Sequence, residues 1–241
     1  MKTDRTTFLI LLPIISASIA LLSPAGRPNE RFLYYGQKAK DPNAELFEAK
    51  STKIGTQIWT TENLDVSNFR NGDVIAEADS YDAWEKACIN GTPVWCYYKN
   101  DKVKSKGMGK LYNFWAVIDK RKLASEGWHV PSDAEWAKLV ETLGGNETAG
   151  KSMKSAKGWK NNQNGDNASG FNGIPTGYRS HEKPAYYGGP FFEAGSGGYW
   201  WSSTRYLVDN GYCRILSYKN SGLDKSSFVL TAGLSIRLVK D

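Results

Sequence analysis

The chain has 241 residues, of which 40% are hydrophobic and 13% aromatic, so it is neither disordered nor fibrous. Its length suits one large domain with a core of its own, preceded by a short leader. The formal charge of +6 at pH 7 is a small excess. Its densest lysine run lies between Lys99 and Lys110, and we interpret this run as a solvated loop rather than a site for an anionic polymer. Without a clustered basic face, the composition argues against a nucleic-acid partner.

The first residues have the order of a secretory signal peptide. Lys2 and Arg5 precede an apolar run from Phe8 to Leu22, and small residues follow it. We predict a signal peptide over residues 1–25, with cleavage after Ala20 equally consistent. An uncleaved anchor helix is the alternative, which the short run disfavours because a bilayer needs about 20 residues. The chain is therefore expected to be secreted or held at the cell surface, with membrane contact only through the leader.

The segment after the leader has the composition of a linker. Residues 26–51 are polar, show no hydrophobic period and include Pro28 and Pro42. The folded domain is expected over residues 52–241. Its predicted first elements are a strand or hairpin over Ile54–Trp59, a helix over Tyr81–Ala87 and a strand over Val94–Tyr98.

A helix with one buried face is predicted next. Leu111, Trp115 and Ile118 follow one another at helical spacing, which indicates a helix over Leu111–Lys122.

The clearest local signal is a helix start. Ser132 and Glu135 have the spacing of a capping box, in which each side chain bonds the backbone amide of the other residue. This predicts a helix from Asp133 to about Leu143, ended by the glycine at Gly144.

The second half of the chain has the pattern of strands. Leu234, Ile236 and Leu238 alternate with Ser235 and Arg237, as in a half-buried antiparallel strand. Helices early in the chain and strands late in it predict an α+β domain. The predicted strands are Ile174–Arg179, Tyr199–Ser203, Tyr212–Tyr218 and Leu234–Val239.

Several phrases, taken together and in order, resemble the Fibrobacter succinogenes major paralogous domain, a family of exported bacterial proteins. They are Ile58–Leu64, Gly109–Val117, Gly127–Trp136, Gly177–Arg179, Tyr199–Thr204 and Gly233–Arg237. The phrase at Gly127–Trp136 is also similar to formylglycine-generating enzymes, whose domain is a variant of the C-type lectin fold. The resemblance implies a C-type-lectin-like architecture, with two helices packed on a twisted antiparallel sheet and long irregular loops.

Three cysteines are present, and we predict a disulfide between Cys88 and Cys96 that leaves Cys213 alone. The alternative is three buried thiols that behave as small hydrophobic residues. The sequence departs from the resembled family at Leu238, where a cysteine often stands. This departure argues against a disulfide from Cys213 to the last strand.

No catalytic constellation is recognisable. We interpret His129 as a structural residue at the helix entrance, and His181 is a lone histidine in a polar loop. Formylglycine chemistry uses two cysteines near the end of the domain, where this chain has only Cys213. The sequence therefore favours a protein that is not an enzyme.

No metal or cofactor is expected either. Calcium takes six to eight oxygen ligands, several of them carboxylates. The turn-rich stretch Asn161–Gly173 offers Asp166 among many amides, which favours a plain hydrogen-bonded loop over a metal site.

The remaining feature is the abundance of Trp and Tyr. Rings stack on the C–H faces of sugars, whose hydroxyl groups bind amides and charged side chains. We interpret Trp59, Trp115, Trp128, Trp136 and the pair Trp200–Trp201 as core residues, and the loop aromatics, Phe191 and Phe192 included, as surface candidates. The candidate ligand-binding residues are Arg179, Tyr186, Tyr187, Tyr206, Asp209 and Asn210.

We therefore expect a module that binds a polysaccharide or another cell-surface component through the loops between Arg179 and Asn210. The alternative is a structural or assembly subunit whose loops meet a protein partner. A flat exposed apolar patch would favour the protein partner, and a cleft with rings flanked by amides would favour sugar. An enzyme would require a histidine or a carboxylate pair that converges in a pocket.

Overall fold

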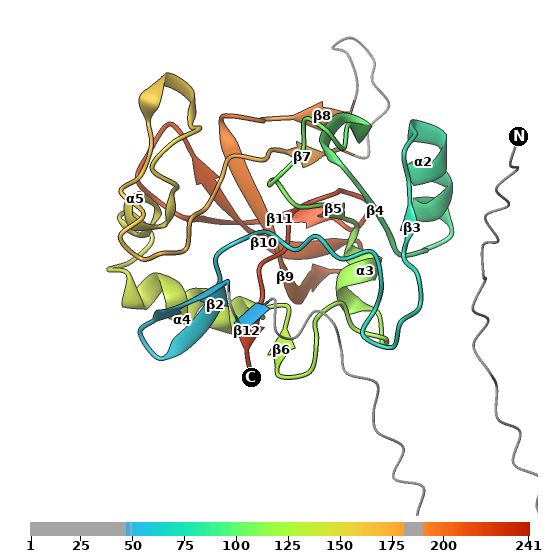
Figure 1. Cartoon of the computed structure of the whole chain (residues 1–241), viewed down its shortest axis with the longest axis horizontal. Coiled ribbons are helices and arrows are strands. Elements are labelled where there is room, and N and C mark those ends of the chain that lie inside the picture. The colour runs from blue at the N-terminus through green and yellow to red at the C-terminus, as the bar shows by residue number, and fades with distance from the viewer. Residues whose placement is uncertain (1–46, 49, 181–189) are drawn as a thin grey trace, which may run out of the picture. The chain divides into compact units, whose positions relative to one another are not determined.

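In the computed structural model, which describes residues 47–48, 50–180 and 190–241, the first and last strands lie in one antiparallel sheet (Figure 1). Its strands are β1 (Ser51–Ile54), β2 (Gln57–Thr60), β6 (Trp128–His129) and β12 (Val239–Lys240). The order is β1-β2-β12-β6, and Val239 pairs with both Trp59 and His129. The predicted opening hairpin is confirmed, with Gly55 in its turn at a φ of 63°.

A three-stranded antiparallel sheet forms the middle of the domain (Figure 1). It contains β9 (Gly197–Leu207), β10 (Asn210–Ser217) and β11 (Asp224–Val229), in the order β11-β10-β9. Cys213 pairs with Trp201, and the next residue, Arg214, pairs with Trp200. Because neighbouring residues of a strand face opposite sides, Trp201 and Trp200 lie in two different hydrophobic clusters. The sheet therefore separates two cores.

Five shorter strands complete the sheets. A mixed sheet contains β3 (Ala76–Glu77), β4 (Val94–Cys96) and β5 (Leu111–Tyr112), and a two-stranded sheet contains β7 (Tyr178–Arg179) and β8 (Phe191–Phe192).

The helices are α2 (Tyr81–Ile89), α3 (Phe114–Ile118), α4 (Asp133–Thr142) and α5 (Ala149–Met153), with 3-10 turns at Tyr98–Asn100 and Lys160–Asn162. The capping box of α4 is confirmed, with Ser132 and Glu135 each bonding the amide of the other. On its buried face, the ring of Trp136 lies 4.7 Å from that of Trp59. The tryptophans predicted as core are buried except Trp115, which is half-buried.

The helix predicted over Leu111–Lys122 is shorter than expected and buries a different face. Leu111 forms a strand pair with Cys96, and the Asn113 side chain caps the five-residue helix that follows. Ile118, expected to be buried, is 37% exposed. The helix prediction from residue spacing was wrong at its start because Leu111 and Tyr112 pair with strand β4 instead of entering the helix.

The last predicted strand also differs from expectation. Only Val239 and Lys240 form a strand. Leu234 and Ser235, which precede them, each form an isolated β-bridge, with Tyr112 and Trp200. Ser235 and Arg237, expected to face water, are fully buried. Both sides of this segment are covered by protein, and the side chains of Ser235 and Arg237 form hydrogen bonds with other buried groups. The alternation is therefore not that of a half-buried strand.

The three cysteines are free thiols, and each is buried. Cys88 and Cys96 belong to one hydrophobic cluster with Trp84 and Leu111. The disulfide predicted between these two cysteines is not formed in this structure. The thiols pack instead as small hydrophobic residues, as in the alternative interpretation.

The architecture is α+β, as predicted. Folding extends into the segment expected to be a linker, since Phe47 is buried against Trp128 and Ser51 belongs to β1. The predicted signal peptide lies outside the described residues. Within the described part of the chain, no helix combines the length and apolarity needed to cross a membrane.

Candidate functional site

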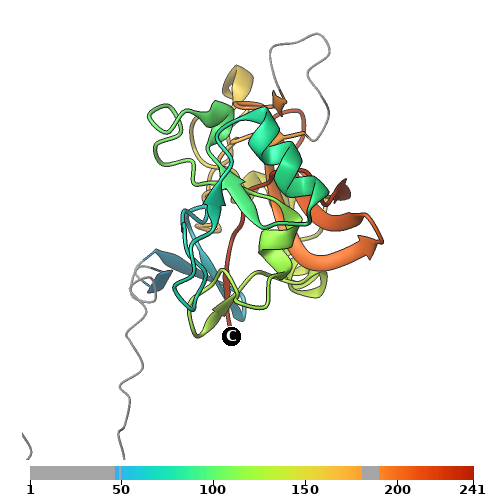
Figure 2. The same ribbon diagram turned by 90° about the vertical axis from the view of Figure 1, so that its right-hand side faces the viewer.

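The end of the β9–β10 hairpin carries the most exposed ring among the predicted surface candidates that the structure describes. This hairpin is the orange pair of strands that projects at the right of Figure 2. Tyr206 is 48% exposed, and its ring centroid lies 4.9 Å from that of Tyr212 on the neighbouring strand. Asp209 lies in the turn that joins the two strands, and Asn210 is the first residue of β10, so both lie between the two tyrosines in the sequence. Asn210 pairs with Leu207 across the turn, and the pairing of β9 with β10 is irregular between Asn210 and Cys213.

The Tyr212 ring is held from its other side by charged groups. Lys225 Nζ lies 4.0 Å from the centroid of this ring and 2.8 Å from Asp133 Oδ2. Arg214 Nη2 lies 2.7 Å from Asp133 Oδ1, an ion pair without the alignment of a hydrogen bond. Burial raises the pKa of Asp133, but the two neighbouring cations, Lys225 and Arg214, outweigh this effect and leave the pKa lowered. The position of the Tyr212 ring is therefore fixed by Lys225, which the ionised Asp133 at the start of α4 holds in place.

The structure brings together three of the six predicted ligand-binding residues. Tyr206, Asp209 and Asn210 share the hairpin. Tyr186 and Tyr187 lie outside the described residues.

Arg179 is a correction, because it is only 1% exposed and is not a surface residue. Its guanidinium donates to the carbonyls of Ala78 and Ser80 and lies 4.4 Å from the ring of Trp84. Phe191, also expected on the surface, is half-buried and lies 5.0 Å from the same guanidinium. This cation therefore fastens β7 to α2 instead of offering itself to a ligand.

Sequence reasoning missed Tyr212 and Lys225. A signal for Tyr212 was present, since Tyr206 and Tyr212 lie at equal distances from Asp209 and strands were predicted on both sides of it. Two strands joined by a tight turn bring such residues face to face. Lys225 had no local signal because it lies on β11, a strand with too polar a sequence to be predicted.

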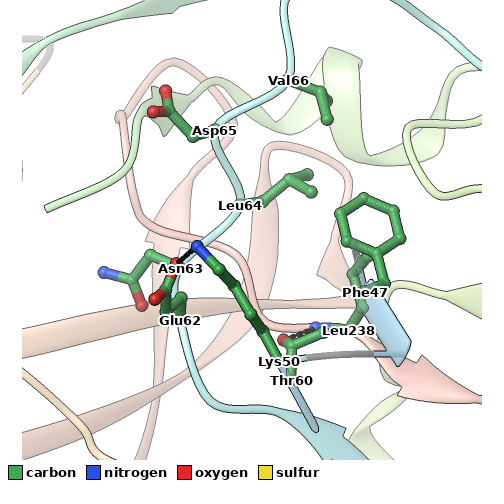
Figure 3. Close-up of a pocket in the computed structure, with 9 residues that line it drawn as sticks. All are labelled: Phe47, Lys50, Thr60, Glu62, Asn63, Leu64, Asp65, Val66 and Leu238. Carbon is green, nitrogen blue, oxygen red and sulfur yellow. Dashed lines mark hydrogen bonds and ion pairs between the residues drawn. The ribbon is translucent and has the colours of Figure 1, made fainter. Parts of the chain in front are cut away.

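A first hollow, of about 210 Å³, lies under the segment that enters the domain (Figure 3). Figure 3 shows Lys50 reaching Glu62, 2.7 Å away, with the ring of Phe47 near Leu64 and Val66.

The polar groups of the first hollow are already engaged. Asp65 pairs with Lys110, which is 4% exposed and not in a solvated loop as predicted. The Asn63 side chain bonds Met108, Ser235, Trp200 and Arg237 within the core. The hollow is lined by one aromatic ring, that of Phe47, and by no free amide. It therefore lacks the rings flanked by amides that we expect of a sugar-binding cleft.

A second hollow, of about 370 Å³, lies beside His129. The two ring nitrogens of His129 lie 2.7 Å from Glu135 Oε1 and 2.5 Å from Asp241 Oδ1. A general base must offer a ring nitrogen to its substrate. Both nitrogens are occupied here, which supports the structural role predicted for His129.

The comparison of this sequence with known families finds a match. A family model described as the Fibrobacter succinogenes major domain matches residues 52–240, more than half of the chain. The chain belongs to this family. The resemblance carried by the six phrases is thereby confirmed. No curated protein and no solved structure matches the chain.

Within this Fibrobacter succinogenes major domain, the asparagine-rich loop is closed by its own hydrogen bonds. Asp166 accepts the amide of Ala168 at 3.0 Å, and Asn167 accepts that of Asn172 at 2.7 Å. Across the described residues, no group of three or more His, Cys, Asp or Glu side chains could hold a metal ion.

Proposed function

We propose that this member of the family is an exported bacterial module that binds polysaccharide at the outer surface through the tip of its β9–β10 hairpin. The observation that carries the proposal is the exposed Tyr206 ring, which lies 4.9 Å from the Tyr212 ring and is followed in the chain by Asp209 and Asn210. The leader-like order of residues 1–25 supports export.

The chemistry of the tip suits a sugar. A pyranose presents C–H groups on its faces and hydroxyl groups at its edge, so it needs a ring beside hydrogen-bonding side chains. The two tyrosines supply ring surface and phenol groups, while Asp209 and Asn210 supply acceptors and a donor. Because Lys225 and Asp133 brace Tyr212, little conformational entropy is lost when a ligand binds.

The architecture proposed for this domain is C-type-lectin-like. Two helices of 9 and 10 residues, α2 and α4, stand beside antiparallel sheets, and irregular loops such as Asn161–Gly173 join them. These features support the proposal. A solved structure of a family member compared with C-type lectins would test it.

The function is tested by binding of the chain from Arg27 to Asp241 to soluble glycans and insoluble polysaccharides, with and without a calcium chelator. We expect selective binding that Tyr206→Ala lowers by about five- to thirtyfold, because a ring stacked on a sugar contributes on the order of 1–2 kcal/mol. Phe192→Ala is the matched control, since Phe192 is an exposed ring, 38% accessible, on a different strand. Unchanged circular dichroism shows that each variant is folded. Binding that Tyr206→Ala leaves intact would remove the hairpin from the proposal.

A protein partner in surface assembly is the second candidate function. The same tip exposes Leu207 by 60% and Val208 by 80%, and consecutive exposed apolar residues suit a protein interface better than a sugar. Leu207→Ser and Val208→Ser separate the two functions. They should abolish capture of a protein partner but lower glycan binding little, because neither residue is an aromatic ring.

A further inference from the structure

The second hollow is built from five separate segments of the chain, and His129 and Asp241 represent two of them. Arg70 comes from the loop after the first hairpin, Lys120 and Lys122 follow α3, and Ser203 belongs to β9. Its volume of about 370 Å³ lies within the range of small-molecule sites. Val117, Ile118 and Val130 add apolar wall to these polar groups.

Arg70 is held rigidly at the wall of this hollow. Its Nε donates to the carbonyl of Ala124 at 2.5 Å, and its Nη2 donates to those of Ser125 and Trp128 at 2.7 and 3.0 Å. These three bonds fix the plane of the guanidinium. Nη1 has no partner within the part of the chain that the structure describes. One edge of an oriented cation is therefore left for a ligand.

The other charges of the hollow leave an excess of positive charge. Asp119 is paired with Arg121, and the Asp241 side chain is paired with His129, so the two side-chain carboxylates that line the hollow are engaged. Lys120 and Lys122 are exposed, and neither forms an ion pair with any described residue. The three cations without a carboxylate partner, Arg70, Lys120 and Lys122, thus line a single hollow.

We propose that this hollow binds an acidic saccharide, with the carboxylate of a uronic acid residue bound by Arg70, Lys120 and Lys122. The negative charge of the ligand follows from the hollow alone, while the choice of a saccharide rests on the proposed function. The apolar wall fits the C–H face of a sugar ring, which a small inorganic anion would leave uncovered. The hollow is a site distinct from the Tyr206 tip and selects acidic polymers among the polysaccharides.

The test is titration calorimetry of the chain from Arg27 to Asp241 with trigalacturonate. Its methyl ester is the neutral counterpart, and inorganic phosphate is the anion without a ring. We expect trigalacturonate to bind at least about tenfold more tightly than the ester or phosphate, with an affinity that falls as salt is added. The paired variant Lys120→Gln with Lys122→Gln should lower this affinity about tenfold.

The matched control is Lys102→Gln with Lys106→Gln, which removes the same charge from two exposed lysines elsewhere. It should bind as the parent chain does. Arg70 is left intact, because its loss would free three carbonyls and disturb the fold. Equal binding of ester and acid, equal binding of phosphate, or an unchanged lysine variant would each overturn the proposal. Tyr206→Ala distinguishes the two proposals, since it should weaken neutral glycans and leave the preference for acid over ester intact.

Discussion

The guanidinium of Arg237 and the side chain of Asn63 meet in the protein interior, with Arg237 Nε 2.8 Å from Asn63 Oδ1. Arg237 is fully buried, and its remaining N–H groups donate to the carbonyls of Thr60, Phe171 and Asn172. Burial lowers the pKa of Arg237 to about 9, so the group still carries its proton at neutral pH. One cation thus joins the first hairpin, the asparagine-rich loop and the last segment.

Removing this cation should destabilise the domain strongly. Arg237→Met keeps the length of the side chain but removes the guanidinium donor from the carbonyls of Thr60, Phe171 and Asn172, while Asn63 Oδ1 keeps its bond from Trp200 Nε1. We expect the free energy of unfolding to fall by about 3–5 kcal/mol. Urea unfolding followed by circular dichroism measures the loss. Arg205→Met, at an exposed arginine of the hairpin, should change stability by only about 0.5 kcal/mol. A loss at Arg237 as small as that of the control would show that these carbonyls find other donors.

The same residue shows what could and could not be predicted from the sequence. The helix at α4 was predictable because Ser132 and Glu135 specify it by contacts three residues apart. Arg237 was assigned to a solvent-facing position because alternation predicts burial on one side only. Its partners Asn63 and Phe171 lie far away in the chain. The pattern of neighbouring residues cannot indicate that such distant partners will bury the other face of the Leu234–Val239 segment.

The candidate sites divide in the same way. The ring pair of Tyr206 and Tyr212 could have been predicted, since a hairpin is a local structure. The hollow that contains Arg70 could not, because its wall forms only when β9 and the segment after α3 meet the loop of Arg70. The densest lysine run of the sequence begins at Lys99 and was interpreted as a solvated loop, whereas the unpaired lysines of the hollow are Lys120 and Lys122.

Stability should depend on pH through His129. Burial by itself lowers the pKa of His129, but the hydrogen bonds to Asp241 and Glu135 outweigh it and raise the pKa above the ordinary 6.5. A raised pKa means that the stabilisation is fully present below pH 6.5 and is lost as the pH rises through the folded-state pKa.

Glu135 sets the acid limit. Burial raises its pKa, but bonds from Ser132 and His129 lower it below the ordinary 4.5, so its stabilisation is lost as the pH falls. The melting temperature should therefore be highest between these two limits. His129→Gln should flatten the loss on the alkaline side, whereas His181→Gln should retain it. An alkaline loss that persists in His129→Gln would assign it to another group.

The three cysteines should be unreactive in the folded protein. Burial raises the pKa of Cys88 and of Cys213 to about 12 and that of Cys96 to about 11, so almost no thiolate exists at neutral pH. Iodoacetamide should modify none of them in the native protein and all of them in urea, as read by mass spectrometry. Native protein purified without reductant should show no disulfide between Cys88 and Cys96. A crosslinked peptide containing both would contradict the packing of free thiols described above.

The position of the hairpin depends on the contact between Gly211 and Phe114. A Cβ atom added at Gly211 would lie 2.2 Å from Phe114 Cε2, and Phe114 is fully buried against Trp201. Gly211→Ala should therefore force the strand away from α3 and lower the free energy of unfolding by about 1–3 kcal/mol. Because Gly211 is the residue before Tyr212, the variant should also weaken any ligand held at the ring pair.

A double-mutant cycle with Phe114→Leu tests this cause directly. The smaller leucine leaves a cavity that costs stability, but it also leaves room for the methyl group of Gly211→Ala. The double variant should be more stable than the sum of the single losses predicts, by about 0.5–3 kcal/mol. Ser227→Ala, at a half-buried position of β11, is the control and should add independently to Phe114→Leu. Strict additivity for Gly211→Ala would mean that its cost comes from the backbone of β10 and not from the Phe114 ring.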